Sequence, residues 1–184
     1  MILIDETYFV GELSLPNIRT SGAGVSVGVD LALQTVGEND LDVFVDKYVI
    51  DYLVRLFGRE FTQTFLDEIA ATTPDPIWLN VRKQLLIKYG PYNYSPLANY
   101  VYFHLTRNAV TKTTQAGEAD PKFEYAENAS VSDNLITAWN DMTRMTLVIV
   151  KWFNEHFDDY KGYLKKASGR DVCSLTKFIN KFGI

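Results

Sequence analysis

Residues 132–160 read SDNLITAWNDMTRMTLVIVKWFNEHFDDY, and this stretch decides the fold. Its apolar side chains recur at steps of three and four residues, which is the spacing of one face of an α-helix. That face carries Leu135, Ala138, Trp139, Met142, Thr146, Ile149, Trp152, Phe153 and Tyr160. A helix of roughly 28 residues is about 42 Å long, comparable to the diameter of a compact chain of this size. We therefore expect one long helix in the C-terminal half, against which the other elements pack.

The first half of the chain contains the signals of two helices. Apolar residues recur with the helical period after Asn39, and Asn39 or Asp40 can cap the start of this helix. Gly58 then supplies the left-handed backbone conformation that commonly ends a helix. A shorter helix is predicted over residues 59–71. Its buried side would carry Phe61, Phe65 and Ile69.

Two more helices are predicted by a capping residue that is followed by proline at the first helical position. Asp75 and Ser95 are these capping residues, and each precedes a proline. The helices are expected over residues 76–89 and 96–113, joined by a tight turn over residues 90–94.

The N-terminal segment has a different pattern. It is rich in glycine, and its apolar residues alternate with a period of two, which is typical of a strand with one buried face. The alternating residues are Val25, Val27, Val29, Leu31 and Leu33. Residues 2–15 are apolar enough to pair with this strand. We therefore expect a small β element at the N-terminus.

Residues 115–131 show little periodicity and are predicted to form a long loop. Loops of this length are uncommon inside compact domains and are usually functional or mobile. This one contains four acidic residues, Glu118, Asp120, Glu124 and Glu127. A solvated acidic loop is the favoured interpretation, and a site for a hard cation is the alternative.

The chain is expected to form a single, mainly α-helical domain over residues 1–184, because no flexible linker divides it. Within it, residues 1–37 hold the β element and residues 38–163 form a helical bundle around the long helix. Residues 164–184 form a tail with helical spacing, for which a short terminal helix is predicted. The tail's apolar residues are Leu175, Phe178, Ile179 and Phe182.

Composition argues against several classes of function. A formal net charge of −5 and a pI near 5.0 offer no basic field for a phosphate backbone, so tight nucleic-acid binding is not expected. The run Leu147–Val150 is far shorter than the roughly 20 apolar residues that cross a bilayer. The start of the chain lacks the pattern of a signal peptide, so export is not expected either. Cys173 is the single cysteine, which suits a reducing compartment, and we expect it to be a small buried apolar residue.

The sequence predicts no catalytic residue, no cofactor and no metal ligand. His104 and His156 are the two histidines, and they have no metal-ligand spacing. We expect His104 to be a hydrogen-bonded core imidazole and His156 to lie near the C-terminal end of the long helix, where the dipole favours it. No nucleophile elbow and no phosphate-binding loop occur, and the glycines of residues 22–28 precede the alternating segment instead of linking a strand to a helix.

Four aromatic residues lie in predicted turns or loops, where no core stripe requires them. They are Tyr92, Tyr94, Phe123 and Tyr125. Aromatic side chains at such positions are common at protein interfaces. They could equally fold back onto the body of the domain, and the residues alone do not decide between the two.

The run YGPYNYSPLANYVY at residues 89–102, followed by Arg107-Asn108 and by TKTTQAGE at residues 111–118, carries a family resemblance. It resembles proteins of uncharacterised function from tailed phages and prophages of gut Bacteroidetes. The order of the expected helices is also similar to that of head-tail connector, or adaptor, proteins, which form rings beneath the portal. The likeness covers about residues 39–160.

This resemblance implies a non-enzymatic structural protein of a phage particle, which forms a ring with copies of itself and contacts portal or tail proteins. Such a protein would be found in the bacterial cytoplasm during assembly and then in the virion. The resemblance implies that bundle faces and the loop over residues 115–131 contact neighbouring subunits. The predicted subunit or partner interface includes Tyr92, Tyr94, Gly117, Glu118, Phe123 and Tyr125. A monomeric helical module that binds an unknown partner is the alternative, and an enzyme with carboxylate chemistry is a third hypothesis.

Overall fold

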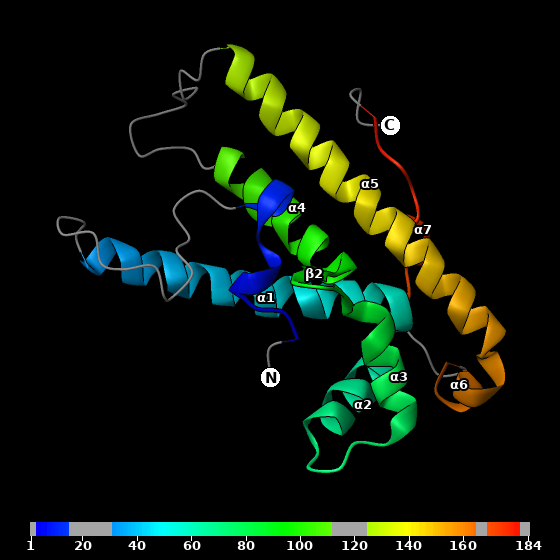
Figure 1. Cartoon of the computed structure of the whole chain (residues 1–184). Helices are drawn as coiled ribbons and strands as arrows, with labels where there is room; N and C mark the ends of the chain where they lie inside the picture. The colour runs from blue at the N-terminus through cyan, green and yellow to red at the C-terminus, as the bar shows by residue number, and fades with distance from the viewer. Residues whose placement is uncertain (1–2, 15–30, 112–124, 165–168, 181–184) are drawn as a thin grey trace.

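The computed structural model describes residues 3–14, 31–111, 125–164 and 169–180 (Figure 1). Within these ranges the fold is mainly α, as predicted. The elements are the 3-10 helices η1 (Glu6–Tyr8) and η2 (Gly11–Leu13), the strands β1 (Ile87–Tyr89) and β2 (Tyr92–Tyr94), and the helices α1 (Leu31–Phe57), α2 (Arg59–Ala70), α3 (Pro76–Leu85), α4 (Pro96–Thr111), α5 (Tyr125–Glu155), α6 (Phe157–Leu164) and α7 (Val172–Leu175).

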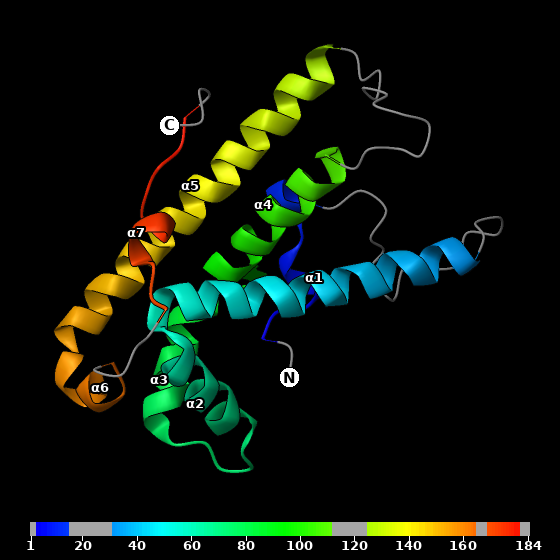
Figure 2. The same ribbon diagram turned by 180° about the vertical axis from the view of Figure 1, so that it is seen from behind.

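The longest helix, α5, supports much of the fold. It contacts α4, α6, α7 and η2, and α4 lies along it (Figure 1). Seen from behind, α1 passes across one end of α4, with α2 and α3 at its C-terminal end (Figure 2). A hydrogen bond of 2.7 Å between the hydroxyls of Tyr52 and Thr146 joins α1 to α5 inside the core. Both side chains are fully buried, so this bond fixes how the two helices meet.

A cluster of aromatic side chains fills the end of the bundle where α1, α2, α3, α5 and α6 meet. We call it the aromatic core, and it consists of Phe57, Phe61, Phe65, Trp78, Phe153 and Tyr160, all buried. The ring centroids of Phe57 and Phe61 are 4.7 Å apart, and those of Phe61 and Trp78 are 5.2 Å apart. The Tyr160 hydroxyl donates a hydrogen bond of 2.9 Å to the carbonyl of Ile77, so its polar end is satisfied.

The predicted helix boundaries at Gly58, Asp75 and Ser95 are confirmed. Gly58 has a φ of 89° and donates its N–H to the carbonyl of Val54, which ends α1. The carboxylate of Asp75 accepts from the N–H of Ile77 at 3.0 Å. The buried Ser95 hydroxyl accepts from the N–H of Leu97 and donates to the carbonyl of Leu85, so it satisfies both the start of α4 and the end of α3.

The predicted N-terminal β element is wrong, and the hairpin lies in the middle of the chain instead. Residues 3–14 form two 3-10 turns, in which the carboxylate of Asp5 accepts from the N–H of Thr7. Such local side-chain bonds compete with strand pairing. The bounds of α1 include Leu31 and Leu33, which we expected in a strand, and the remaining alternating residues lie outside the described ranges.

The predicted helix over residues 76–89 is four residues too long. It ends at Leu85, and residues 87–89 pair with residues 92–94 as an antiparallel hairpin. The turn is Gly90-Pro91, with a φ of 59° at Gly90. Proline fixes a negative φ, and a positive followed by a negative φ is the sign pattern of the type II′ turn that suits a two-residue hairpin.

The end of the long helix and the long loop also differ from the prediction. The bounds of α5 begin at Tyr125, so residues 125–131 belong to this helix and not to a loop. The rest of the predicted loop, residues 115–124, lies outside the described residues. The C-terminal end of α5 is Glu155 and not Tyr160. Asp158 and Asp159 in the first turn start a new helix, α6, because acidic residues stabilise a helix N-terminus.

Among the described residues of the C-terminal tail after α6, Val172–Leu175 form the short helix α7, but the predicted helical spacing does not continue through Phe178 and Ile179. Residues 176–180 run along α5 without helical structure, as Figure 1 shows. The Asn140 side chain donates to the carbonyl of Ile179 and accepts from its N–H, at 3.0 and 2.9 Å. These side-chain bonds replace the backbone bonds that a helix would have made.

Candidate functional site

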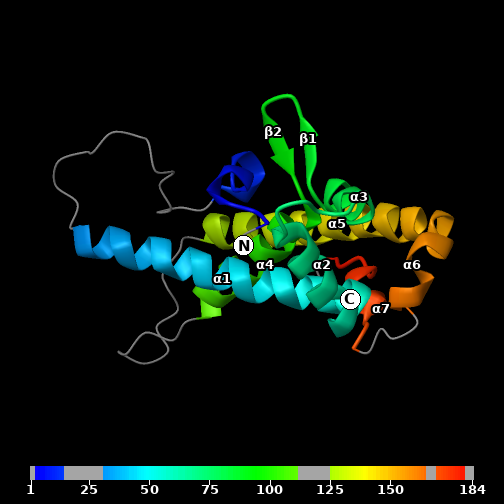
Figure 3. The ribbon, with the colours of Figure 1, turned by 90° about the horizontal axis from the view of Figure 1, so that it is seen from below.

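The hairpin presents three exposed tyrosines on one of its faces. Paired residues of an antiparallel ladder share a face, and alternate residues of a strand return to it. Tyr89 pairs with Tyr92, and Ile87 pairs with Tyr94, so these four side chains lie on the same face. We call Tyr89, Tyr92 and Tyr94 the tyrosine face. Their exposed fractions are 68%, 57% and 46%, and the hairpin projects from the helices (Figure 3).

The tyrosine rings contact one another instead of the core. The ring centroids of Tyr89 and Tyr94 are 6.0 Å apart in an edge-to-face arrangement, and those of Tyr92 and Tyr94 are 6.5 Å apart. The short hairpin is anchored to the N-terminal segment by Asn93, whose side chain donates to the Thr7 hydroxyl at 2.8 Å. The aromatic face is therefore held in one orientation without being covered by described residues.

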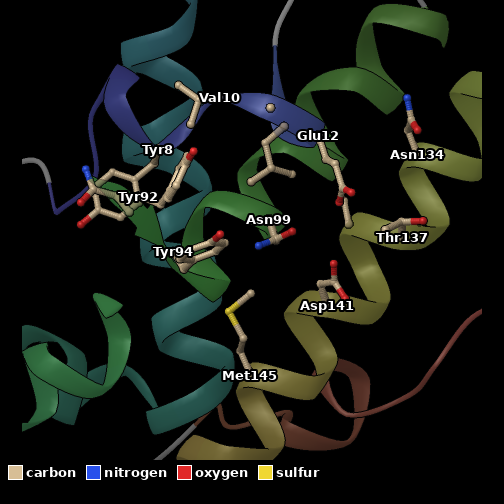
Figure 4. Close-up of a pocket in the computed structure, with 14 residues that line it drawn as sticks. Tyr8, Val10, Glu12, Tyr92, Tyr94, Asn99, Asn134, Thr137, Asp141 and Met145 are labelled. Carbon is tan, nitrogen blue, oxygen red and sulfur yellow. The ribbon is translucent and has the colours of Figure 1, made fainter. Parts of the chain in front are cut away.

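A hollow of about 490 Å³ lies between the N-terminal segment, the hairpin and α5. We call it the tyrosine groove (Figure 4). One wall is aromatic, with Tyr8 beside Tyr92 and Tyr94. The opposite wall belongs mainly to α5 and is polar, with Thr137 and Asp141. A ligand that fits the groove therefore needs one apolar or flat side and one polar side.

The groove also offers amide and carboxylate groups. Asn99, at the start of α4, donates to the carbonyl of Ser95 at 3.1 Å, which holds its side chain in place at the groove. Glu12 and Asp141 contribute the negative charge. Asp141 also pairs with Arg144 through its Oδ1 atom, so Arg144 offsets part of this charge, and the guanidinium of Arg144 lies 5.9 Å from the ring centroid of Phe178. None of the described residues that line the groove is a lysine, arginine or histidine.

Burial affects the ionisation of one groove tyrosine. The pKa of Tyr8 is raised, first because the side chain is partly buried and second because the carboxylate of Asp5 is close, while Arg82 acts in the opposite direction. Tyr8 therefore stays protonated at neutral pH and keeps a hydroxyl that can donate a hydrogen bond.

A second polar cluster joins α1 to α4. Oδ2 of Asp51 accepts from the Tyr100 hydroxyl at 2.5 Å and from Nε of Arg55 at 2.8 Å. Burial by itself raises the pKa of Asp51, but these two hydrogen bonds and the charge of Arg55 outweigh it, and the net shift is downward. The pKa of Tyr100 is raised by burial and by its bond to Asp51. Asp51 thus stays ionised and Tyr100 stays protonated, which does not suit either group to act as a general acid or base.

His104 lies next to this cluster, at a hollow of about 440 Å³. Its ring stacks on Tyr48 with centroids 4.4 Å apart, and its buried Nε2 atom has no hydrogen-bond partner among the described residues. At Nε2 the expected hydrogen bond is therefore not made within the described part of the chain, and the ring packs by stacking. Burial lowers the pKa of His104 to about 4, so the imidazole is neutral at pH 7.

The remaining candidates for chemistry are easily placed. His156 follows the end of α5, as predicted, and its Nδ1 atom lies 2.9 Å from the carbonyl of Trp152. Cys173 is exposed, so the expectation of a buried cysteine is wrong. The part of the chain that the structure describes contains no group of histidine, cysteine, aspartate and glutamate residues that could hold a metal ion. Its helices include none that is long and apolar enough to cross a bilayer.

No family model, curated protein or solved structure matches this chain. Function therefore has to be argued from the geometry of the site and from the sequence resemblance.

The structure brings together only part of the predicted interface. Tyr92 and Tyr94 both lie at the tyrosine groove. Tyr125 is the first residue of α5, but its side chain lies outside the described positions. The other three predicted residues lie outside the described ranges altogether: Gly117, Glu118 and Phe123.

Sequence reasoning missed several residues of the site. Tyr89 could have been found, because tyrosines on both sides of Gly90-Pro91 are a hairpin signal. Tyr8 and Asp141 gave no such signal, since tertiary contacts alone bring the N-terminal segment and α5 to the hairpin.

Proposed function

We propose that this protein is a non-enzymatic assembly protein that binds a partner protein through the tyrosine face. The observation that carries the proposal is the exposure of three large aromatic side chains on one side of an anchored hairpin. Tyrosine is enriched at protein interfaces because it offers a large contact area and a hydroxyl at a low cost in side-chain entropy. Exposed aromatic clusters of this kind mark binding sites more often than they occur by chance.

The position of the tyrosine face also favours protein binding over small-molecule chemistry. The face lies on a projecting hairpin (Figure 3) and continues into the tyrosine groove. A partner could therefore contact a raised aromatic surface and a neighbouring hollow at the same time. This combination of an aromatic anchor region with polar groups around it is typical of protein interfaces.

We propose, more specifically, that the protein is a head-tail connector of a tailed phage that forms a ring with copies of itself. The support is the resemblance carried by residues 89–102, since this run contains the last residue of β1, the turn, all of β2 and the start of α4. The residues of the resemblance and the exposed tyrosines thus coincide. Portal or tail proteins are the further partners under this proposal, and the assembled virion is its location.

Native mass spectrometry over a wide concentration range tests the proposal. The wild-type protein should form closed assemblies above the 20.9 kDa monomer, and the double variant Tyr89→Ser, Tyr92→Ser should remain monomeric. Val148→Ser is the matched control, because Val148 is 62% exposed on α5, far along the chain from the hairpin, and its loss should leave the assemblies intact.

Two results would count against the proposal. Assemblies that survive in the double tyrosine variant would remove the tyrosine face from the interface. Absence of the protein from purified virions whose genome encodes it would sink the connector role. A strict monomer that captures a partner only when the tyrosines are present would support the alternative, a monomeric interaction module.

A further inference from the structure

The tyrosine groove has two unlike walls, and its described lining carries acidic side chains but no basic ones. Its aromatic wall comes from the N-terminal segment and the hairpin, and Glu12 and Asp141 lie on the other side of the hollow (Figure 4). No positively charged described residue lines it, and the ion pair of Asp141 with Arg144 uses only the Oδ1 atom. Arg144 offsets part of the charge of Asp141, so Glu12 and the Oδ2 atom of Asp141 supply the negative potential that an incoming cation can neutralise.

An arginine or lysine side chain matches both walls at once. Its guanidinium or ammonium group is attracted to the face of a tyrosine ring and forms charge-assisted hydrogen bonds with a carboxylate. Its aliphatic stem is suited to lie against the aromatic wall. An uncharged ligand such as a sugar could use the tyrosines and amides but would gain nothing from the charge of Glu12 or from the unpaired oxygen of Asp141.

The groove can also serve the backbone around such a side chain. Asn99 and Asn134 line it, and an amide side chain can donate to a peptide carbonyl and accept from a peptide N–H. An extended peptide must replace the hydrogen bonds with water that its backbone loses on binding. Amides beside carboxylates therefore suit a segment of chain better than an isolated cation.

From these observations we propose that the tyrosine groove binds an extended segment of the partner protein through an arginine or lysine side chain. This inference rests on the proposed protein-binding function and names the chemistry of the partner. Tyr92 and Tyr94 face the stem and head of the cationic side chain, and the carboxylates of Glu12 and Asp141 bind its charge.

Methionine methyl NMR gives a local test. The chain has three methionines, and Met145 lines the groove whereas Met142 is fully buried. The probe is a short peptide in which arginine alternates with glycine and serine, and its control carries the neutral isostere citrulline at each arginine position. The arginine peptide should shift the methyl signal of Met145 and leave that of Met142 in place, and the citrulline peptide should shift neither.

Substitutions that remove the carboxylate charges of the groove but keep the shape of the side chains test the electrostatic part of the proposal. The double variant Glu12→Gln, Asp141→Asn should bind the arginine peptide about tenfold more weakly, because two charge-assisted contacts are lost. Glu155→Gln, an exposed acid at the end of α5 outside the groove lining, should bind as the wild type does. Binding should also weaken as the salt concentration rises.

Several outcomes would overturn the inference: equal binding of the citrulline peptide, an unchanged affinity in the double variant, or a Met145 shift caused by a neutral oligosaccharide in place of the peptide. The proposed function has its own readout. If the peptide test fails while Tyr89→Ser, Tyr92→Ser still abolishes assembly, the groove chemistry is wrong and the tyrosine interface stands. If both fail, the interface itself is wrong.

Discussion

The aromatic core and the tyrosine face are both rich in aromatic rings, yet they meet solvent in opposite ways. In the core, Phe61 and Trp78 are 1% and 2% exposed, whereas the tyrosines of the hairpin are about half exposed or more. The rings of the core are contributed by five helices that close around them. The rings of the tyrosine face stand on two strands of three residues each.

The difference shows that aromatic content says little until the geometry of the supporting element is known. Helices with apolar stripes can surround a ring from several directions, so burial is complete and stabilising. A two-stranded hairpin has two faces and no second layer above one of them, so its side chains there stay exposed. Exposed side chains contribute little to the free energy of folding, and we therefore assign the tyrosine face to binding.

The largest expected effect is that of Trp78→Ala. Trp78 contacts Phe61, Phe65, Tyr160 and Tyr163, and its removal leaves a cavity in the aromatic core. We expect a loss of about 3–5 kcal/mol in the free energy of unfolding, as for other buried tryptophans. Urea denaturation followed by circular dichroism measures it. A loss below about 1 kcal/mol would show that this region is not the core we describe.

A pH-dependent effect is expected from His104, which stacks on Tyr48 outside both regions. The unfolded side chain has a pKa near 6.5 and the folded one a pKa of about 4, so between these values the unfolded chain binds a proton that the folded chain does not. The stability is therefore complete above pH 6.5 and falls as the pH is lowered towards 4. Because the side chain is partly exposed, the loss is discounted to on the order of 1–2 kcal/mol.

The variant His104→Phe tests this, because phenylalanine keeps a ring that can stack on Tyr48 but cannot titrate. Thermal unfolding at several pH values should give a flatter profile between pH 6.5 and 4 than that of the wild type. Asp51, Arg55, Arg107 and Lys47 also act on His104, and they are unchanged in the variant. An identical loss of stability in both proteins would assign the acid sensitivity to other groups.

A smaller effect is expected when the aromatic core keeps its rings but loses a hydroxyl. Tyr160→Phe removes the hydrogen bond to the carbonyl of Ile77 and should lower the free energy of unfolding by about 1 kcal/mol. The substitution does not change the net charge at neutral pH, because burial raises the pKa of Tyr160 to about 12 and the hydroxyl is protonated there. Tyr163→Phe, at an exposed tyrosine of the same helix, is the control and should have no measurable effect.

The smallest effect on folding is expected at the tyrosine face. Tyr92→Ser should change the free energy of unfolding by less than about 0.5 kcal/mol, since an exposed side chain away from the core adds little to stability. Urea denaturation beside the Trp78→Ala variant checks this. A loss as large as that of a core substitution would mean that Tyr92 supports the fold, and the contrast between the two regions would fail.

The helices were largely predictable because their signals are local. The apolar stripes that end in Leu56, Ile69 and Leu85 and the caps at Asp75 and Ser95 all depend on residues a few positions apart, and the structure has them as expected. The candidate site was predictable only in part. Tyr92 and Tyr94 were predicted to be interface residues because they are aromatic residues in an expected turn. Tyr8 and Asp141 line the same groove, although they are more than 80 and about 50 residues away from them in the sequence.

Local chemistry in the chain thus determines where α2, α3 and α4 start, because capping and periodicity act over one or two turns. The bounds of α1 and α5 begin at Leu31 and Tyr125, before the starts predicted near Asn39 and Ser132. Tertiary structure decides the rest. Helix α5 ends at Glu155, and α6 then brings the Tyr160 hydroxyl to the carbonyl of Ile77. The groove forms only because three segments that are distant in the sequence meet. Contacts between such segments depend on the packing of the whole fold, which short-range patterns do not encode.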